Sequence, residues 1–308
     1  MTQKATWIIP ERGFFWVIKL GVILYRTIGT RISFILIHPI VAYFFLTDRK
    51  GRKSSLKYLN KVYNTPRGRD NFKRPPGLRE CYRHYYEYGA VMVDRFGFWA
   101  GRYFDFRFNW HGKEHFANAL DSGFFVLGAH MGTLDIMRIQ VREFNLSKLK
   151  VLMFTDNSKQ ITRVLTSINK NAAEDIYPLG SVSPSTIFDL EELLKDHTKI
   201  GIMGDRTAAN NKDRVVKIPF LGEEASFPLG PFLLMGLLKC PVHMLFCLRT
   251  GKNEYDVFVR PFADSIHLPR KNREEQLTHY LTEYAKHLED FCCRYPYQWF
   301  NFYDFWAE

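Results

Sequence analysis

The residues best suited to chemistry in this chain are His130 and Asp135, in the sequence GAHMGTLD. An apolar run at 124–127 ends at Gly128, and an apolar-periodic segment begins at Leu134, so the pattern predicts a strand, a tight turn and a helix. Histidine has the side-chain pKa nearest neutrality, and a carboxylate can fix its tautomer. We therefore predict that His130 is a general base and that Asp135 orients it.

The turn that carries His130 also supplies backbone N–H groups. The amides of Gly132 and Thr133 are predicted to stabilise the oxyanion of a tetrahedral intermediate. The sequence contains no G-x-S-x-G elbow and no cysteine beside a histidine. The attacking hydroxyl should therefore belong to a substrate, which is acyl transfer by direct attack. A single His-x4-Asp pattern also arises by chance, and the alternative is a histidine hydrogen-bonded within a turn.

The elements that must position these residues alternate between strands and helices from about residue 107. Strands are predicted at 124–127, 150–154, 175–179, 199–203, 242–248 and 255–260. Helices are predicted at 134–144, 161–173, 185–196, 229–238 and 273–294, after earlier helices at 54–64 and 78–99. The expected fold is α/β, with a mixed, largely parallel sheet flanked by helices. Active sites in such sheets lie outside the carboxyl ends of strands, where His130 is placed.

The expected domain organisation has two parts. Residues 1–53 form a helical membrane-anchoring segment, and residues 54–308 form the catalytic domain. Within that domain we expect a helical lead-in at 54–106, an α/β core at 107–265, and a C-terminal helix with an aromatic tail at 266–308. A tail so rich in aromatic side chains should be packed against protein or lipid.

Composition favours contact with an anionic surface. The 308 residues carry 43 Lys and Arg against 32 Asp and Glu, a net charge of +11, and 16% are aromatic. Apolar runs at 14–25 and 32–47 precede the basic cluster DRKGRK at 48–53, which predicts attachment to the cytoplasmic side of a membrane. The alternative is that the apolar runs are core helices. The five cysteines show no paired spacing and are expected to be reduced thiols in the cytoplasm.

The HMGTLD block, followed by GDR at 204–206, resembles the glycerophospholipid acyltransferase superfamily, whose first block is His-x4-Asp. It is most similar to the branch of the bacterial late acyltransferases of lipid A. In that branch a membrane-anchoring helix comes first, a phrase like WHGKEHF at 110–116 lies upstream of the block, and a Pro-x-x-Trp like PYQW at 296–299 lies near the end. The resemblance covers nearly the whole chain.

The resemblance implies roles for several residues. His130 would be the base and Asp135 its holder. Gly204, Asp205 and Arg206 match a second polar block that binds substrate, and Glu114 lies in the upstream phrase. A guanidinium suits phosphate, so Arg206 is the candidate for a charged part of the donor or acceptor, the alternative being a surface ion pair with Asp205.

The expected reaction moves a fatty acyl chain from a thioester to a hydroxyl of a membrane lipid or glycolipid, with no cofactor. Acyl carrier protein is favoured over coenzyme A as the donor's carrier because it is acidic and this chain is basic. The sequences at 227–230 and 299–304 depart from the phosphatidate and lipid A patterns, so the acceptor stays open.

Three rival interpretations remain. The HGKEH sequence at 111–115 matches an inverted zinc-protease signature, although Gly112 weakens the helix that this signature requires. A non-enzymatic protein could hold anionic lipid through its basic cluster. Nucleic-acid binding rests on the charge alone, since no recognition motif is present, and we expect no nucleic-acid partner.

Overall fold

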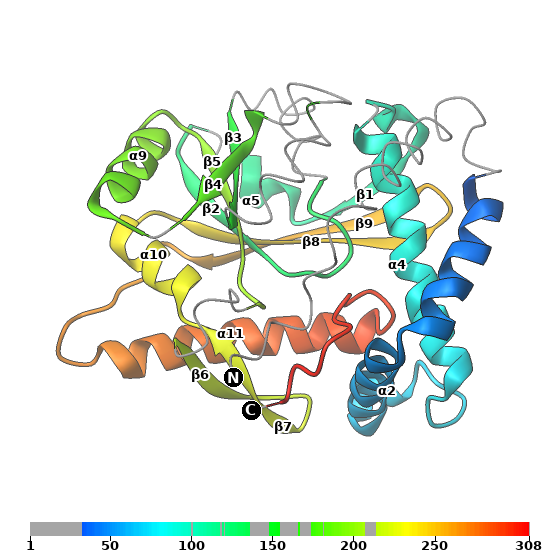
Figure 1. Ribbon diagram of the computed structural model, residues 1–308. Coiled ribbons are helices and arrows are strands. Elements are labelled where there is room, and N and C mark those ends of the chain that lie inside the picture. The colour runs from blue at the N-terminus through cyan, green and yellow to red at the C-terminus, as the bar shows by residue number, and fades with distance from the viewer. Residues whose placement is uncertain are drawn as a thin grey trace.

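The fold is α/β, as a computed structural model shows (Figure 1). The structure describes residues 33–99, 101–117, 119, 121–135, 148–154, 166, 174–180, 182–206 and 214–307. A seven-stranded sheet in the order β1-β9-β8-β2-β5-β3-β4 forms its centre. Its strands are β1 (Arg107–His111), β2 (Phe124–Gly128), β3 (Leu149–Phe154), β4 (Ile176–Leu179), β5 (Lys199–Met203), β8 (Val242–Gly251) and β9 (Glu254–Ala263). Only β8 and β9 pair antiparallel, so the predicted largely parallel sheet is confirmed.

All six predicted strands are present, but three further strands were not anticipated. β1 is a half-exposed edge strand without a continuous apolar run, so no periodic signal marks it. β6 (Val215–Phe220) and β7 (Glu223–Pro228) form a separate antiparallel hairpin. The predicted helices at 134–144 and 161–173 fall almost entirely outside the described residues.

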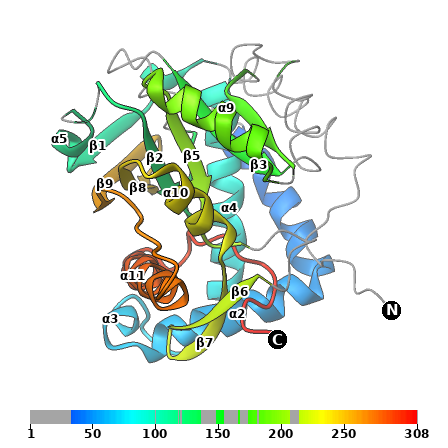
Figure 2. The ribbon, with the colours of Figure 1, turned by 90° about the vertical axis from the view of Figure 1, so that its left-hand side faces the viewer.

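Helices flank the sheet (Figures 1 and 2). They are α2 (Arg49–Asn64), α3 (Pro66–Arg69), α4 (Leu78–Trp99), α5 (Lys113–Ala117), α9 (Pro184–Lys195), α10 (Gly230–Leu238) and α11 (Arg273–Arg294), with a short 3₁₀ turn at Tyr103–Asp105. The apolar stripe of α11 packs on the β8–β9 pair, where the ring of Phe291 lies 4.2 Å from Phe246 and 5.1 Å from Phe258, between centroids. The helix predicted at 273–294 is therefore present, and its apolar stripe docks it on the body of the protein.

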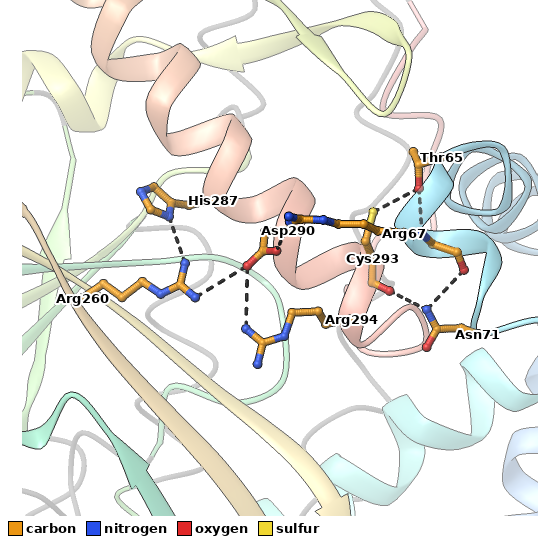
Figure 3. A network of polar contacts seen from close by, with 9 residues as sticks. Thr65, Arg67, Asn71, Arg260, His287, Asp290, Cys293 and Arg294 are labelled. Carbon is orange, nitrogen blue, oxygen red and sulfur yellow. Dashed lines mark hydrogen bonds and ion pairs between the residues drawn. The ribbon is translucent and has the colours of Figure 1, made fainter.

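A polar network joins α11 to β9 and α3 (Figure 3). Asp290 forms ion pairs with Arg67 at 3.1 Å, Arg260 at 3.6 Å and Arg294 at 3.7 Å. The Asn71 side-chain amide donates to the Cys293 carbonyl at 2.6 Å. Exposed ion pairs contribute little to the free energy of unfolding. We therefore expect the network to fix the position of α11 relative to β9 and α3 more than to stabilise the protein.

The aromatic tail is packed against protein, which confirms its prediction. Trp299, Phe300 and Phe305 are buried. Trp299 contacts the ring of Tyr58 on α2 at 5.0 Å between centroids. All five cysteines are buried free thiols. The aromatic tail is therefore part of the hydrophobic core.

His84 on α4 fastens the tail to two helices. Its Nε2 donates to the carbonyl of Trp299 at 2.9 Å, so Nδ1 accepts from the hydroxyl of Ser55 on α2, also at 2.9 Å. Burial lowers the pKa of His84 to about 4, which keeps the imidazole neutral at physiological pH. The helix predicted at 78–99 is therefore present, and it contacts both α2 and the aromatic tail.

The segment 33–47 is helical and lies beside α4 at the edge of the molecule (Figure 1). Ile37 and Val41 are buried in one cluster with Tyr85 and Val93 of α4. The other sides of the segment expose apolar side chains, namely Ile35, Leu36, Ile40, Tyr43, Phe44 and Leu46. Within the described residues, none of the helices combines the length and the apolar character needed to cross a bilayer. The apolar run at 14–25 lies outside those residues.

Candidate active site

Two neighbouring parallel strands position the site. β2 and β5 are paired in register, with Gly128 opposite Met203 at their carboxyl ends. His130 and Asp205 each lie two residues beyond these positions, so they emerge side by side at one edge of the sheet. The five residues of β2 are all buried, which fixes the strand from which His130 emerges.

Asp205 holds His130 through two hydrogen bonds. Nδ1 of the imidazole lies 2.8 Å from Oδ1, and the backbone N–H of His130 donates to Oδ2 at 2.9 Å. Nε1 of Trp299 donates to the same Oδ2 at 3.0 Å. The Asp205 side chain is 1% exposed, whereas that of His130 is 31% exposed. A buried carboxylate therefore fixes a histidine that still reaches solvent.

Electrostatics keep this pair in the form that a base requires. Burial alone would raise the pKa of Asp205, but the charge and hydrogen bond of His130, together with Arg206 and Trp299, outweigh burial and lower that pKa to about 2. Desolvation and then the charge of Arg206 lower the pKa of His130, against the opposing effect of Asp205. At neutral pH the carboxylate is ionised and the imidazole is neutral.

The tautomer follows from the charge on Asp205. An ionised carboxylate can only accept, so Nδ1 carries the proton and Nε2 keeps its lone pair. Within the described part of the chain, Nε2 has no hydrogen bond from a serine, a cysteine or any other residue. The pair can take a proton from a bound hydroxyl. It corresponds to the histidine and the aspartate of a Ser-His-Asp triad, without the serine.

Asp135 has different partners from those predicted. Its carboxylate accepts from Nε of Arg95 at 2.5 Å, from Nε1 of Trp99 at 3.0 Å and from the hydroxyl of Thr133 at 3.2 Å. The structure therefore places Asp205, and not Asp135, at Nδ1 of His130. The orienting role of Asp135 stays a prediction, and its two α4 partners were not foreseen.

The amides of Gly132 and Thr133 are already bonded within the protein. The N–H of Gly132 donates to the carbonyl of Gln298 at 2.9 Å, and the N–H of Thr133 donates to that of Cys247 at 3.0 Å. Gly132 has φ +60°, and a Cβ there would lie 1.9 Å from the Cys247 carbonyl oxygen, so only glycine fits. In this arrangement neither amide is available to an oxyanion, contrary to the prediction.

The second polar block divides between structure and site. Gly204 is buried, and a Cβ there would lie 2.9 Å from Leu127 and 3.0 Å from the ring of Tyr284. Gly204 and Asp205 therefore support the site from within the fold, and their contact with a substrate stays a prediction. Because Asp205 is buried, the alternative of a surface ion pair with Arg206 is wrong.

Arg206 lies against the aromatic tail. Its Nη2 donates to the carbonyl of Phe300 at 2.5 Å, its guanidinium carbon lies 5.6 Å from the ring centre of Tyr303, and its Nε is buried without a partner in the described structure. Substrate binding by Arg206 stays a prediction.

Glu114 is far from this edge. β1 runs opposite to β2, because it is parallel to β9 and β9 is antiparallel to β8, which is parallel to β2. The carboxyl end of β1, and α5 after it, therefore lie at the opposite ends of the strands from His130, where Phe116 packs on Phe124 at the start of β2. The Glu114 side chain is 70% exposed there. The structure therefore does not bring Glu114 together with His130 and Asp205, and substrate binding by Glu114 stays a prediction.

The continuous helix that a zinc-protease signature needs is absent. β1 ends at His111, Gly112 has φ +80°, and α5 begins at Lys113. His111 and His115 therefore do not lie one turn apart on one helix.

Sequence reasoning missed Arg95 and Trp99 on α4 and did not foresee the contact of Trp299 with Asp205. The Pro-x-x-Trp phrase is a signal for Trp299, because it lies near the end of the chain in the family that the sequence resembles. No local pattern marks Arg95, because its partner lies 40 residues away along the chain.

The fold and this pair define an α/β protein with a histidine–aspartate pair at the carboxyl ends of the strands of a largely parallel sheet. The model of the bacterial lipid A biosynthesis acyltransferase family matches residues 3–307, and the chain belongs to that family. It is an acyltransferase, and the predicted resemblance is confirmed. No curated protein matches the chain.

Proposed function

We propose that this acyltransferase moves a fatty acyl chain from a thioester to a hydroxyl of a membrane lipid or glycolipid, with His130 as the general base and no acyl-enzyme intermediate. The observation that carries the proposal is the His130–Asp205 pair, whose Nδ1–Oδ1 distance is 2.8 Å and whose Nε2 faces no protein nucleophile in the described chain. A base without a nucleophile acts on the hydroxyl of the acceptor.

The chain's net positive charge supports acyl carrier protein as the donor's carrier. The chain has 43 Lys and Arg against 32 Asp and Glu, and this excess of positive charge attracts an acidic protein. The family name supports lipid A or a related glycolipid as the acceptor. The family is one of enzymes, which argues against the non-enzymatic alternative.

The test uses the purified full chain with labelled lauroyl thioesters of acyl carrier protein and of coenzyme A, and bacterial membrane lipid as acceptor. We expect label in ester linkage to lipid, none on acid-quenched protein, and a lower KM for the carrier-protein thioester. Lipid mass spectrometry of cells without the gene should then show one acyl chain missing. Label that stays on the denatured protein would contradict direct attack.

We further propose that the protein lies on the cytoplasmic face of the inner membrane through segment 33–47. The segment exposes Ile40 and Phe44 by 48% and 52%, and the basic start of α2 follows it directly. Exposed apolar side chains beside Lys and Arg suit the boundary between acyl chains and anionic head groups.

The double variant Ile40→Ser/Phe44→Ser should bind vesicles less tightly. Loss of two half-exposed apolar side chains removes roughly 2 kcal/mol of burial in lipid, or about a 30-fold decrease in partitioning. The measurement is co-sedimentation with phosphatidylglycerol vesicles. Leu237→Ser on α10 is the matched control, since Leu237 is 52% exposed outside this segment. Equal binding by both variants would exclude the segment as the attachment site.

A further inference from the structure

The proposed reaction creates an oxyanion, and the backbone amides nearest to His130 do not serve it. The N–H groups of Gly132 and Thr133 are donated to the carbonyls of Gln298 and Cys247. Among the described residues, a side chain is therefore the better candidate for a donor to the oxyanion. Two guanidinium groups act on the imidazole of His130, those of Arg206 and Arg95, and each lowers its pKa.

Arg206 is the less suitable of the two cations. Its Nη2 is donated to the Phe300 carbonyl, and its Nε is buried. Arg95 is 30% exposed as a side chain, so a bound substrate can reach it. Its Nε is donated to Asp135 and its Nη1 lies 3.3 Å from the sulfur of Met92, which leaves Nη2 without a hydrogen bond in the described part of the chain.

The position of Arg95 is fixed from several sides. Its guanidinium carbon lies 5.0 Å from the ring centre of Trp99, and the same Trp99 donates Nε1 to Asp135 at 3.0 Å. The hydroxyl of Thr133 donates to Asp135 at 3.2 Å and accepts from its backbone N–H at 3.2 Å. Asp135 is 9% exposed. The segment after β2 therefore carries His130 and, a few residues later, the Asp135 carboxylate that binds Arg95.

We propose that Arg95 is a catalytic residue whose guanidinium binds the oxyanion of the tetrahedral intermediate, and that Asp135 is the positioning residue that holds it there. The carboxylate of the His-x4-Asp block thus serves the arginine, while Asp205 serves the histidine. This inference rests on the proposed function, because it requires acyl transfer with His130 as the base.

The step balances as follows. Nε2 of His130 takes the proton of the acceptor hydroxyl as the acceptor oxygen forms a bond to the thioester carbon. The electron pair of the C=O bond moves to oxygen, where Arg95 binds the negative charge. The carbonyl re-forms, the C–S bond breaks, and the imidazolium returns its proton to the thiolate. The products are an ester and a free thiol, with no change of oxidation state.

The first experiment removes the guanidinium. Loss of one oxyanion donor costs roughly 100- to 1000-fold in kcat. Arg95→Gln should therefore lower kcat for transfer from lauroyl-acyl-carrier-protein by about that factor, with the donor KM changed by less than about threefold. Arg95→Lys keeps the charge without the fork and should retain more activity. In Arg95→Ala, added methylguanidine should restore part of kcat, which loss of a merely structural residue would not allow.

The second experiment separates the two carboxylates. If Asp135 acts through Arg95, the losses from Asp135→Asn and Arg95→Gln are not additive, and Asp135→Asn leaves the response of kcat/KM to Asp205→Asn unchanged. Arg102→Gln and Asp105→Asn are matched controls, because that arginine and aspartate form an ion pair at 2.8 Å just beyond α4. Both should keep full activity.

The outcomes are separable. Near-normal kcat in folded Arg95→Gln, with an inactive His130 variant, overturns the role of Arg95 and leaves the proposed function intact. Additive losses, or a pH profile of Asp135→Asn that matches Asp205→Asn, assign Asp135 to His130 and overturn the role given to Asp135. An active His130→Gln variant refutes the proposed function itself.

Discussion

Replacement of His130 by glutamine is expected to reduce acyl transfer by roughly 1000-fold or more, because it removes the general base that we propose for the acceptor hydroxyl. Glutamine keeps a polar side chain of similar length, so the backbone N–H bond to Asp205 at 2.9 Å should survive. The measurement is transfer of labelled lauroyl from its carrier-protein thioester to membrane lipid, with thermal unfolding as the check on the fold.

His279→Gln is the control for this experiment. His279 lies on α11 and is exposed, so it tests the effect of losing a histidine without touching the site. We expect full activity from it. Substantial transfer by a folded His130→Gln protein would show that the base is another group.

Replacement of Asp205 by asparagine should reduce kcat/KM by about 100- to 10,000-fold, as loss of the orienting carboxylate does in related His-Asp arrangements. The carboxylate receives three N–H groups, at 2.8, 2.9 and 3.0 Å. An amide directs N–H donors of its own against one of these, so the favoured tautomer of His130 and the buried contact with Trp299 are both disturbed.

The pH profile gives Asp205→Asn a second signature. The active imidazole is neutral, so kcat/KM rises as pH increases through the pKa of His130. Asp205 raises that pKa against burial and Arg206, which lower it. Removing Asp205 should therefore shift the acid limb to lower pH, whereas Arg206→Gln should shift it to higher pH. Asp264→Asn, an exposed carboxylate change, should leave the profile unaltered.

The reassignment of the two aspartates has a simple structural cause. His130 and Asp135 are near in sequence, and their spacing suggested that they pair. The turn after β2 sends them to different partners, since Asp135 faces Arg95 and Trp99 of α4 and His130 faces Asp205 beyond β5. Spacing along the chain located both groups but did not determine which of them touch.

The sequence also located Asp205 but did not foresee its contact with His130. The GDR block was predicted to bind substrate, and no local feature indicates that its aspartate is 1% exposed. Burial of a charged residue depends on what packs around it. Here Trp299 donates to Asp205 and Tyr284 packs against the neighbouring Gly204, and both come from the far end of the chain. Such partners are visible only once the chain has folded.

The sequence by itself determined six of the described strands, the helices with strong periodicity, the place of the histidine that we propose as the base, and the family. Buried apolar runs, an exposed basic cluster and a histidine in a glycine turn are local features, and local periodicity records them. Only the tertiary structure decided that β2 lies beside β5 in register, so that residues 75 positions apart form one pair. Strand order results from packing across the whole sheet, and no short stretch of sequence contains it.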